Sequence, residues 1–192
     1  VEFTGVNWKT QRAEHTYSLA GTTETEAITA VNSLSRTFVH TQKRIGVNLP
    51  GTDEFGHEVW LSSIGAVSFY LESGATSPTL QTSVAWIIEN TQTTIGAMDV
   101  TRSDGFTTGG AEPATISVSI GKTLEDLTNA SIFTNTRGAL TTSLHPRVIA
   151  GVTIASSTHY QLWRSDTGAQ LNYRTEVVEW PTAGLSFRQN DY

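Results

Sequence analysis

The sequence predicts an all-β protein made of two tandem antiparallel β-sandwich units of similar topology, related by internal duplication. Three observations support this fold class. Serine and threonine make up about a quarter of the 192 residues, and threonine suits the solvated face of a strand. Short runs of alternating apolar and hydroxyl residues are separated by Gly, Pro, Asn or Asp turns, without strand-helix alternation. Several of these runs recur about 90 residues apart.

The charge pattern disfavours several classes of function. The formal net charge is −6 and lysine occurs only at positions 9, 43 and 122, so there is no basic stripe of the kind that binds phosphates. We therefore expect no nucleic-acid partner. No run of about 18 apolar residues is present, so we expect no membrane partner. The chain has no cysteine, so burial and strand pairing must stabilise it in place of disulfides.

A β-branched residue followed by glutamate marks the end of each repeat. Glu2, Glu89 and Glu179 occupy this motif, 87 residues apart for the first two and 90 for the last two. Chance similarity between two threonine-rich β sequences is the alternative, but the matches occur in the same order in both halves. We predict residues 1–4 as the end of a preceding unit, 5–92 as the first unit, 93–181 as the second unit and 182–192 as a C-terminal tail.

Each unit should contain about six short strands separated by polar turns. In chain order, the corresponding segments are 10–12 with 100–102, 28–31 with 116–119, 37–40 with 131–134, 68–74 with 159–165, and the closing strands 83–88 with 174–178. The extra residues of the second unit fall in 121–129, where 124–127 could form one helical turn.

Alternation along these strands places one face of each sheet in a core. For the first unit we expect Trp60, Leu61, Ile64, Val67, Phe69, Leu71, Val84, Trp86 and Ile88 in that core. For the second we expect Ile116, Val118, Ile120, Phe133, Val148, Val152, Ile154, Tyr160, Leu162 and Val177.

The densest group of potential metal ligands is Asp53, Glu54, His57 and Glu58. Their oxygen and imidazole groups could bind a divalent cation. Proline and glycine around them indicate a solvated loop instead, and the second unit has no counterpart. We therefore expect no metal site and no cofactor.

Catalytic residues are not expected either. The five histidines are widely spaced, and no nucleophile motif surrounds them. The repeated glutamates give one carboxylate per unit rather than a pair across a substrate. We expect these glutamates on edge strands, where charge discourages unwanted pairing, and we expect the chain not to be an enzyme.

Several of these segments together resemble structural proteins of tailed bacteriophages. The segments are 27–31, 36–39, 59–61 and the closing Val-Val-Glu-Trp of 177–180, which is the closest feature. Asn90 departs from the pattern, because an aromatic residue would complete the motif there. The resemblance implies a β-sandwich of the virion surface, either a capsid decoration protein or a tail-associated protein, with no catalytic residues.

Two classes of function stay open at this point, and a third, a hydrolytic enzyme, would require a carboxylate pair that only the folded structure brings together. In the first, the chain is a capsid decoration or accessory protein that binds major capsid or tail proteins and forms a homo-oligomer in the particle. In the second, it is a tail-associated or fibre module that binds host-surface glycans by stacking sugars on Trp8, Trp163 or Trp180. Convergence of aromatic and polar side chains in one exposed cleft would favour the second class.

The C-terminal end supplies the candidate partner-binding residues. Pro181 cannot donate a ladder hydrogen bond, so the closing strand should stop there and release the tail. The apolar groups expected to dock on a neighbouring subunit are Trp180, Leu185, Phe187 and Tyr192.

Deletion of residues 183–192 tests this docking role. We expect lower incorporation of the chain into its particle, because the apolar tail is lost, and an unchanged melting temperature, because the tail lies outside both units. Incorporation is measured by co-sedimentation and stability by calorimetry. Unchanged incorporation with an unchanged melting temperature would eliminate the docking role.

Overall fold

The computed structural model describes residues 7–45, 57–71, 78–93, 97–107, 115–138, 149–164 and 171–181. Over these ranges the chain consists of strands, turns and short 3₁₀ helices, which confirms the all-β fold class. No helix within the same ranges has the length and hydropathy needed to cross a membrane. The predicted end of a preceding unit, 1–4, and the tail, 182–192, lie outside the described residues.

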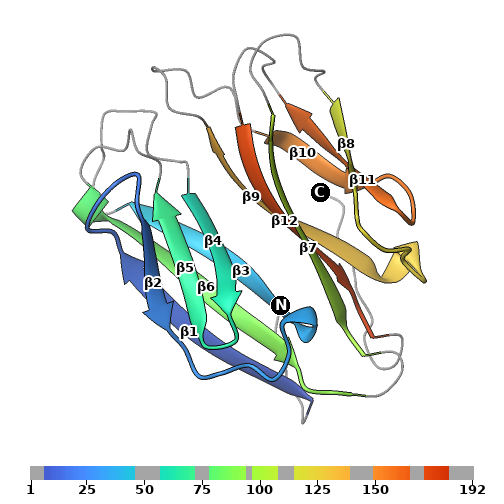
Figure 1. Cartoon of the computed structure of the whole chain (residues 1–192), viewed down its shortest axis with the longest axis horizontal. Coiled ribbons are helices and arrows are strands. Elements are labelled where there is room, and N and C mark those ends of the chain that lie inside the picture. The colour runs from blue at the N-terminus through green and yellow to red at the C-terminus, as the bar shows by residue number, and fades with distance from the viewer. Residues whose placement is uncertain are drawn as a thin grey trace.

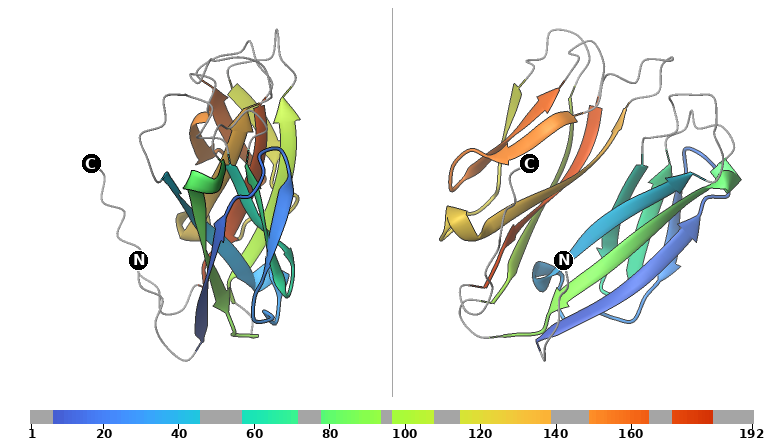
Figure 2. Two further views of the ribbon diagram at one scale, coloured as in Figure 1. Left: turned by 90° about the vertical axis from the view of Figure 1, so that its left-hand side faces the viewer. Right: turned by 180° about the vertical axis from the view of Figure 1, so that it is seen from behind.

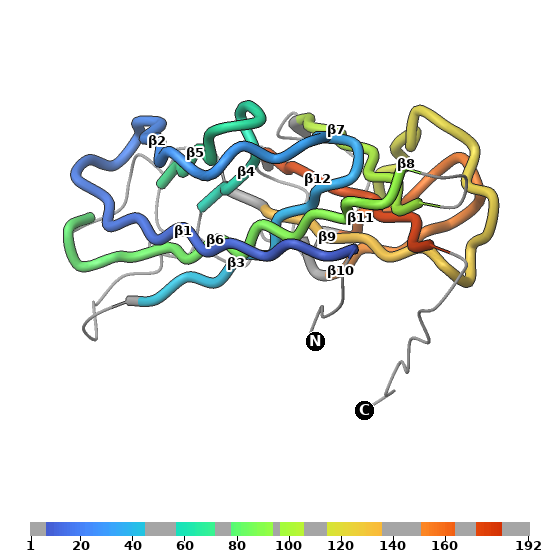
Figure 3. Tube along the Cα trace, turned by 90° about the horizontal axis from the view of Figure 1, so that it is seen from below, coloured from blue at the N-terminus to red at the C-terminus, as the bar shows by residue number. Residues whose placement is uncertain are grey.

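The elements fall into two groups that lie side by side (Figures 1 and 3). The first unit contains β1 (Trp8–Thr16), β2 (Thr23–Ala27), η1 (Leu34–Arg36), β3 (Thr37–Ile45), β4 (His57–Ser63), β5 (Ala66–Leu71), η2 (Pro78–Leu80) and β6 (Gln81–Asn90). The second contains β7 (Asp99–Thr107), β8 (Thr115–Ser119), η3 (Leu127–Asn129), β9 (Ala130–Gly138), β10 (Ile149–Ile154), β11 (His159–Arg164) and β12 (Leu171–Glu179).

Each unit is a sandwich of two three-stranded antiparallel sheets. The sheet orders are β1-β6-β3 and β2-β5-β4 in the first unit, and β7-β12-β9 and β8-β11-β10 in the second. Every strand of the first unit therefore has a counterpart six strands later, in the same place. The right panel of Figure 2 shows the β1-β6-β3 sheet facing the viewer. The two units thus have one topology, as an internal duplication requires.

The register corrects one of the expected correspondences. Segment 116–119 lies in β8, whose counterpart is β2, and not segment 28–31. Ile28 corresponds instead to Ile120, because each donates its backbone N–H to the following hairpin turn, to Gly65 O and Thr158 O, at 2.9 Å. Strand β2 reads Thr-Glu-Thr-Glu-Ala, so a comparison of apolar patterns passes over it and matches the next apolar run.

The core of each unit lies between its two sheets. In the first unit Val59, Leu61, Val67, Phe69 and Leu71 pack against Ala85, Ile87 and other residues of the facing sheet. In the second unit Tyr160 and Leu162 pack against Tyr173 and Val177, with Ile116, Val118, Val152 and Ile154 partly buried around them. Most of the predicted core residues are therefore confirmed.

Strand β6 has the opposite phase to the predicted one. Ser83, Ala85 and Ile87 are buried, whereas Trp86 is 36% exposed. Apolar residues occur in both phases of the alternation along β6. The phase that is not buried in the sandwich carries the larger side chains, so a prediction from side-chain size turns the wrong face of the strand toward the core. Ile64 is also exposed, because it lies in the β4–β5 turn. Ile88 and Phe133 belong to a cluster between the units, and Val148 lies outside the described residues.

Glu89 and Glu179 do not lie on edge strands, because β6 and β12 are the central strands of their sheets, and Glu2 lies outside the described residues. Glu89 accepts the N–H of Asn32 at 2.6 Å. Glu179 accepts the N–H of Glu125 at 2.5 Å, and the ammonium of Lys122 at 2.7 Å. In both units the carboxylate therefore holds the segment that leads into the 3₁₀ turn, so its role is structural but its predicted placement is wrong.

The helical turn expected at 124–127 lies slightly later, at η3, where Asp126 accepts the Thr128 N–H as a cap. The first unit has the equivalent turn in η1. This turn is therefore a shared feature of both units rather than an insertion in the second.

Candidate functional site

The first unit sits on the outer face of the β7-β12-β9 sheet. Arg102, Glu176 and Phe133 form one row across the three strands of this sheet, because Glu176 lies opposite both of the others in the register. Their side chains contact η1 and β3 of the first unit. We refer to this contact region as the junction.

A charge-assisted network occupies the centre of the junction. Glu176 accepts the Arg102 Nε–H at 2.8 Å through Oε1, and it accepts the backbone N–H of Val39 at 2.7 Å through Oε2. Arg102 also donates to the carbonyl oxygens of Leu34, at 2.7 Å, and Thr37. Because β3 is an edge strand, the Val39 N–H would otherwise be open to another strand. The carboxylate therefore closes this edge and fixes the position of the units at the same time.

Burial dominates the electrostatics of Glu176, whose residue is 9% exposed. Burial raises the pKa of its carboxyl group, and the Arg102 guanidinium and the Val39 amide oppose this rise without cancelling it. Because the pKa is raised in the folded state, the contribution of this group to stability falls as the pH rises through the interval between the ordinary and the raised value.

Aromatic rings close one end of the junction. Phe38 stacks on Phe133 with 5.2 Å between ring centroids and meets Trp180 edge to face at 5.3 Å. Trp180 also lies 6.4 Å from Trp8, and its indole Nε1–H donates to Ser131 Oγ at 2.8 Å. Trp180 is only 3% exposed, so its ring serves the junction instead of being presented to a partner. The other candidate partner residues, Leu185, Phe187 and Tyr192, lie outside the described residues.

An arginine closes the other end. The Arg174 guanidinium lies over the ring of Trp60, 4.0 Å from its centroid, and its Nε donates to Glu58 Oε2 at 3.3 Å. Thr41 donates to Asn135 Oδ1 nearby, at 2.9 Å. Glu58, one of the four potential metal ligands in the sequence, is thus engaged across the junction.

The remaining potential ligands do not assemble around Glu58 in the part of the chain that is described. His57 is the first residue of β4, and Asp53 and Glu54 lie outside the described residues. No cluster of metal-ligating side chains is present among the residues that the structure describes.

On the matching face of the first unit, the equivalent row is exposed, although Ile88 of the same face packs in the junction. Arg12, Trp86 and His40 form the corresponding row across β1, β6 and β3. Arg12 lies over the Trp86 ring, 5.9 Å from its centroid, and pairs with Glu14. His40 borders the junction, 6.4 Å from the ring of Phe133. The sequence pattern wrongly places Trp86 in the core. The correspondence of segments 10–12 and 100–102, however, already aligns Arg12 of this row with Arg102 of the other.

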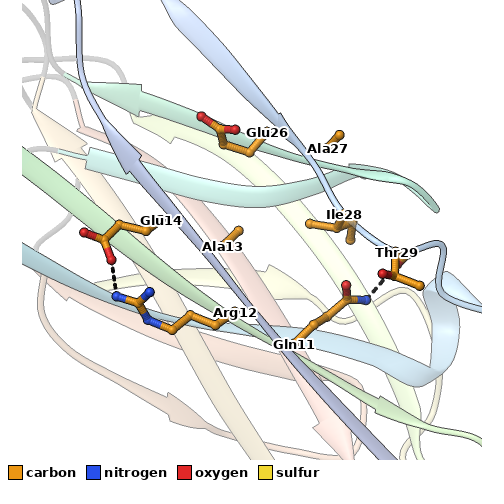
Figure 4. A pocket seen from close by; sticks show the side chains of 8 residues that line it. All are labelled: Gln11, Arg12, Ala13, Glu14, Glu26, Ala27, Ile28 and Thr29. Atoms are coloured by element: carbon orange, nitrogen blue, oxygen red, sulfur yellow. Dashed lines mark hydrogen bonds and ion pairs between the residues drawn. The ribbon is translucent and has the colours of Figure 1, made fainter.

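A groove of about 420 Å³ lies between the edge strands β1 and β2 (Figure 4). Its described lining residues are Gln11, Arg12, Ala13, Glu14, Glu26, Ala27, Ile28 and Thr29, none of which is aromatic. Gln11 donates across it to Thr29 O at 2.7 Å. The tryptophans proposed for sugar stacking do not gather here, because Trp8 and Trp180 are in the junction and Trp163 is on β11.

Beside the groove, a buried histidine lies between two carboxylates. His15 Nε2 is 2.6 Å from Glu24 Oε2, and Nδ1 is 2.8 Å from Glu26 Oε1. The ring stacks on Phe69, with 5.1 Å between centroids. Burial opposes ionisation of Glu24, but hydrogen bonds from Leu19, Ser18 and His15 outweigh it and lower the pKa of Glu24. The cluster ties the turn between β1 and β2 to the core.

In comparisons with known proteins, no family model, curated protein or solved structure matches the chain.

A double-mutant cycle measures the junction. We expect Glu176→Ala to lower the free energy of unfolding by roughly 2–4 kcal/mol, because the Val39 N–H and Arg102 lose their acceptor. Arg102→Ala should be coupled to it by about 1–3 kcal/mol. The matched control is Arg12→Ala, which removes the exposed counterpart of Arg102 and should change stability by roughly 0.5 kcal/mol or less. Urea unfolding provides the values, and additive effects of the two junction substitutions would contradict the network.

The Glu24 carboxylate should make the first unit sensitive to acid. Because its pKa is lowered in the folded state, its contribution to stability is present above the ordinary glutamate value of 4.5 and is lost as the pH falls through the lowered one. Glu24→Gln should therefore lower stability at neutral pH and flatten its decline in acid. Thermal unfolding at a series of pH values checks this, and parallel declines for the two proteins would refute it.

Proposed function

We propose that this chain is a non-enzymatic structural protein of a tailed-bacteriophage virion, displayed on the capsid as a decoration or accessory protein that binds the particle's protein lattice. The assignment to a phage virion comes from the sequence resemblance. The proposal of a structural role has separate support in the arrangement of the two units.

The observation that carries the structural role is the junction. A linker alone would leave two sandwiches free to move, whereas here a buried hydrogen bond from Val39 to Glu176, the Arg174–Glu58 ion pair and stacked rings fix one unit on the other. A rigid pair of units presents its surfaces at a fixed spacing. Such spacing is useful to a protein that binds neighbouring sites of a regular lattice, because the second contact then needs little further ordering.

The buried carboxylates add support. Glu58 binds Arg174, Glu89 binds the Asn32 amide, and Glu176 binds Arg102 and the Val39 amide. Each of these groups stabilises a loop or the junction, which is a structural use of residues that an enzyme would place around a substrate.

Glycan binding by a tail-associated or fibre module is the second candidate. The exposed row of Arg12, Trp86 and His40 favours it, because an open indole ring beside hydrogen-bonding groups can stack on a sugar. The groove between β1 and β2 does not supply such a platform, since its described lining residues include no aromatic side chain.

Binding to purified particles distinguishes the two candidates. We expect the chain to co-sediment with particles that lack it, and its binding to saturate at a fixed ratio to the major capsid or tail protein. We expect no binding to an array of host glycans. Trp86→Ala is the informative variant for the alternative. Failure to bind particles, together with glycan retention that this variant abolishes, would replace the lattice-binding proposal with the glycan-binding one.

A further inference from the structure

The equivalent row of side chains on the outer sheet face is covered in one unit and exposed in the other. In the second unit, the row Arg102, Glu176 and Phe133 is covered by η1 and β3 of the first unit. In the first unit, the corresponding row is uncovered, and Trp86 at its centre is 36% exposed. The junction therefore uses two surfaces, a sheet face and a sandwich edge, and the chain contains a second copy of each.

The junction is not a symmetric contact between the units. Arg102 of β7 reaches the carbonyl oxygens of Leu34 and Thr37, whereas its counterpart Arg12 pairs with Glu14 on its own strand. The sheet face of the second unit thus binds the η1-β3 edge of the first. The equivalent row of the first unit does not bind the η3-β9 edge of the second within the chain. The unused surfaces are the exposed row of Arg12, Trp86 and His40 on the β1-β6-β3 face, beyond the part of that face that packs in the junction, and the exposed η3 end of the η3-β9 edge of the second unit.

We propose that these two unused surfaces bind each other between copies of this chain, so that the second unit of one copy docks on the first unit of the next. Such a face-to-edge contact continues as an open chain of molecules or closes into a ring, depending on the rotation that it imposes. The inference stands on the internal repeat and does not depend on the particle to which the chain belongs.

The edge of the second unit carries the same acceptors as the edge of the first. In η1 the Leu34 carbonyl accepts the N–H of Thr37, and in η3 the Leu127 carbonyl accepts the N–H of Ala130. The Leu34 carbonyl still accepts Arg102, since a carbonyl oxygen has two lone pairs. The Leu127 and Ala130 carbonyls are therefore the acceptors for Arg12 of the next copy.

The apolar part of the contact differs from that of the junction. Leu127 of η3 is 48% exposed, whereas Ile132 of β9 packs into the core of the second unit. On the opposing face, Trp86 stands where the second unit has Glu176, so an indole ring replaces the buried carboxylate. Burying Trp86 against Leu127 removes two exposed apolar groups from water and requires no charge to be desolvated in place of Glu176.

Tethering explains why one contact forms within the chain and the other between chains. The junction is closed by the linker between β6 and β7, which gives its surfaces a high effective concentration. The contact between copies lacks this help, so it should form at high protein concentration or where copies are held close together.

Complementation of two variants tests the proposal. Arg12→Glu disables the face and leaves the edge intact, while Leu127→Asp disables the edge and leaves the face intact. Sedimentation velocity at protein concentrations up to about 1 mM should show association of the unmodified chain, monomers for each variant alone, and association when the two variants are mixed. Ile64→Asp, on the exposed β4–β5 turn, is the matched control and should associate like the unmodified chain.

Circular dichroism and melting temperature verify that each variant is folded, and Trp86→Ser replaces Arg12→Glu if the latter is not. A monomeric unmodified chain over the whole concentration range would overturn the proposal. So would association that Leu127→Asp leaves unchanged, because the face would then bind another surface. Loss of association in both variants, without recovery of association when they are mixed, would also overturn the proposal, since the face and the edge would then not bind each other.

Discussion

The arrangement of the two sandwiches depends on the carboxylate of Glu176. It accepts a hydrogen bond from the edge of the first unit and another from Arg102 of its own sheet, and Arg102 in turn holds η1. Arg102 thereby joins the sheet of the second unit to both the edge strand and the 3₁₀ turn of the first. The aromatic cluster and the Arg174–Trp60 contact lie at opposite ends of the junction, where this central network positions them.

The two units differ most in side-chain chemistry along the equivalent row, which is buried in the second unit and exposed in the first. Both rows begin with an outward arginine, but glutamate and phenylalanine follow in the covered row, and tryptophan and histidine follow in the open one. The glutamate is useful only beside an edge N–H that needs an acceptor, and its burial is tolerated only because that N–H and Arg102 are present. Divergence after duplication thus follows the contact that each face makes.

Much of the fold could be predicted from the sequence because it depends on local patterns. Turn residues, alternation and the spacing of the repeated glutamates lead to two all-β units with matching strands. The phase of β6 could not be predicted, since Val84, Trp86 and Ile88 look as apolar as Ala85 and Ile87. The junction could not be predicted from the sequence for a different reason. Its central hydrogen bond joins residues 137 positions apart, and neither Val39 nor Glu176 carries any local sign of the other.

The position of the aromatic cluster bears on synthesis of the chain. Phe38 and Ile88 are buried by Val178 and Trp180, which are translated about 90 residues after Ile88. At about 5–20 residues per second, a first unit that has already folded therefore waits roughly 5–20 s on the ribosome with these side chains uncovered. During that interval the nascent chain carries an apolar patch beside an edge strand whose Val39 N–H still lacks Glu176. Chaperone demand for this protein should accordingly peak before the last strand emerges, while the first unit is complete and the second is not.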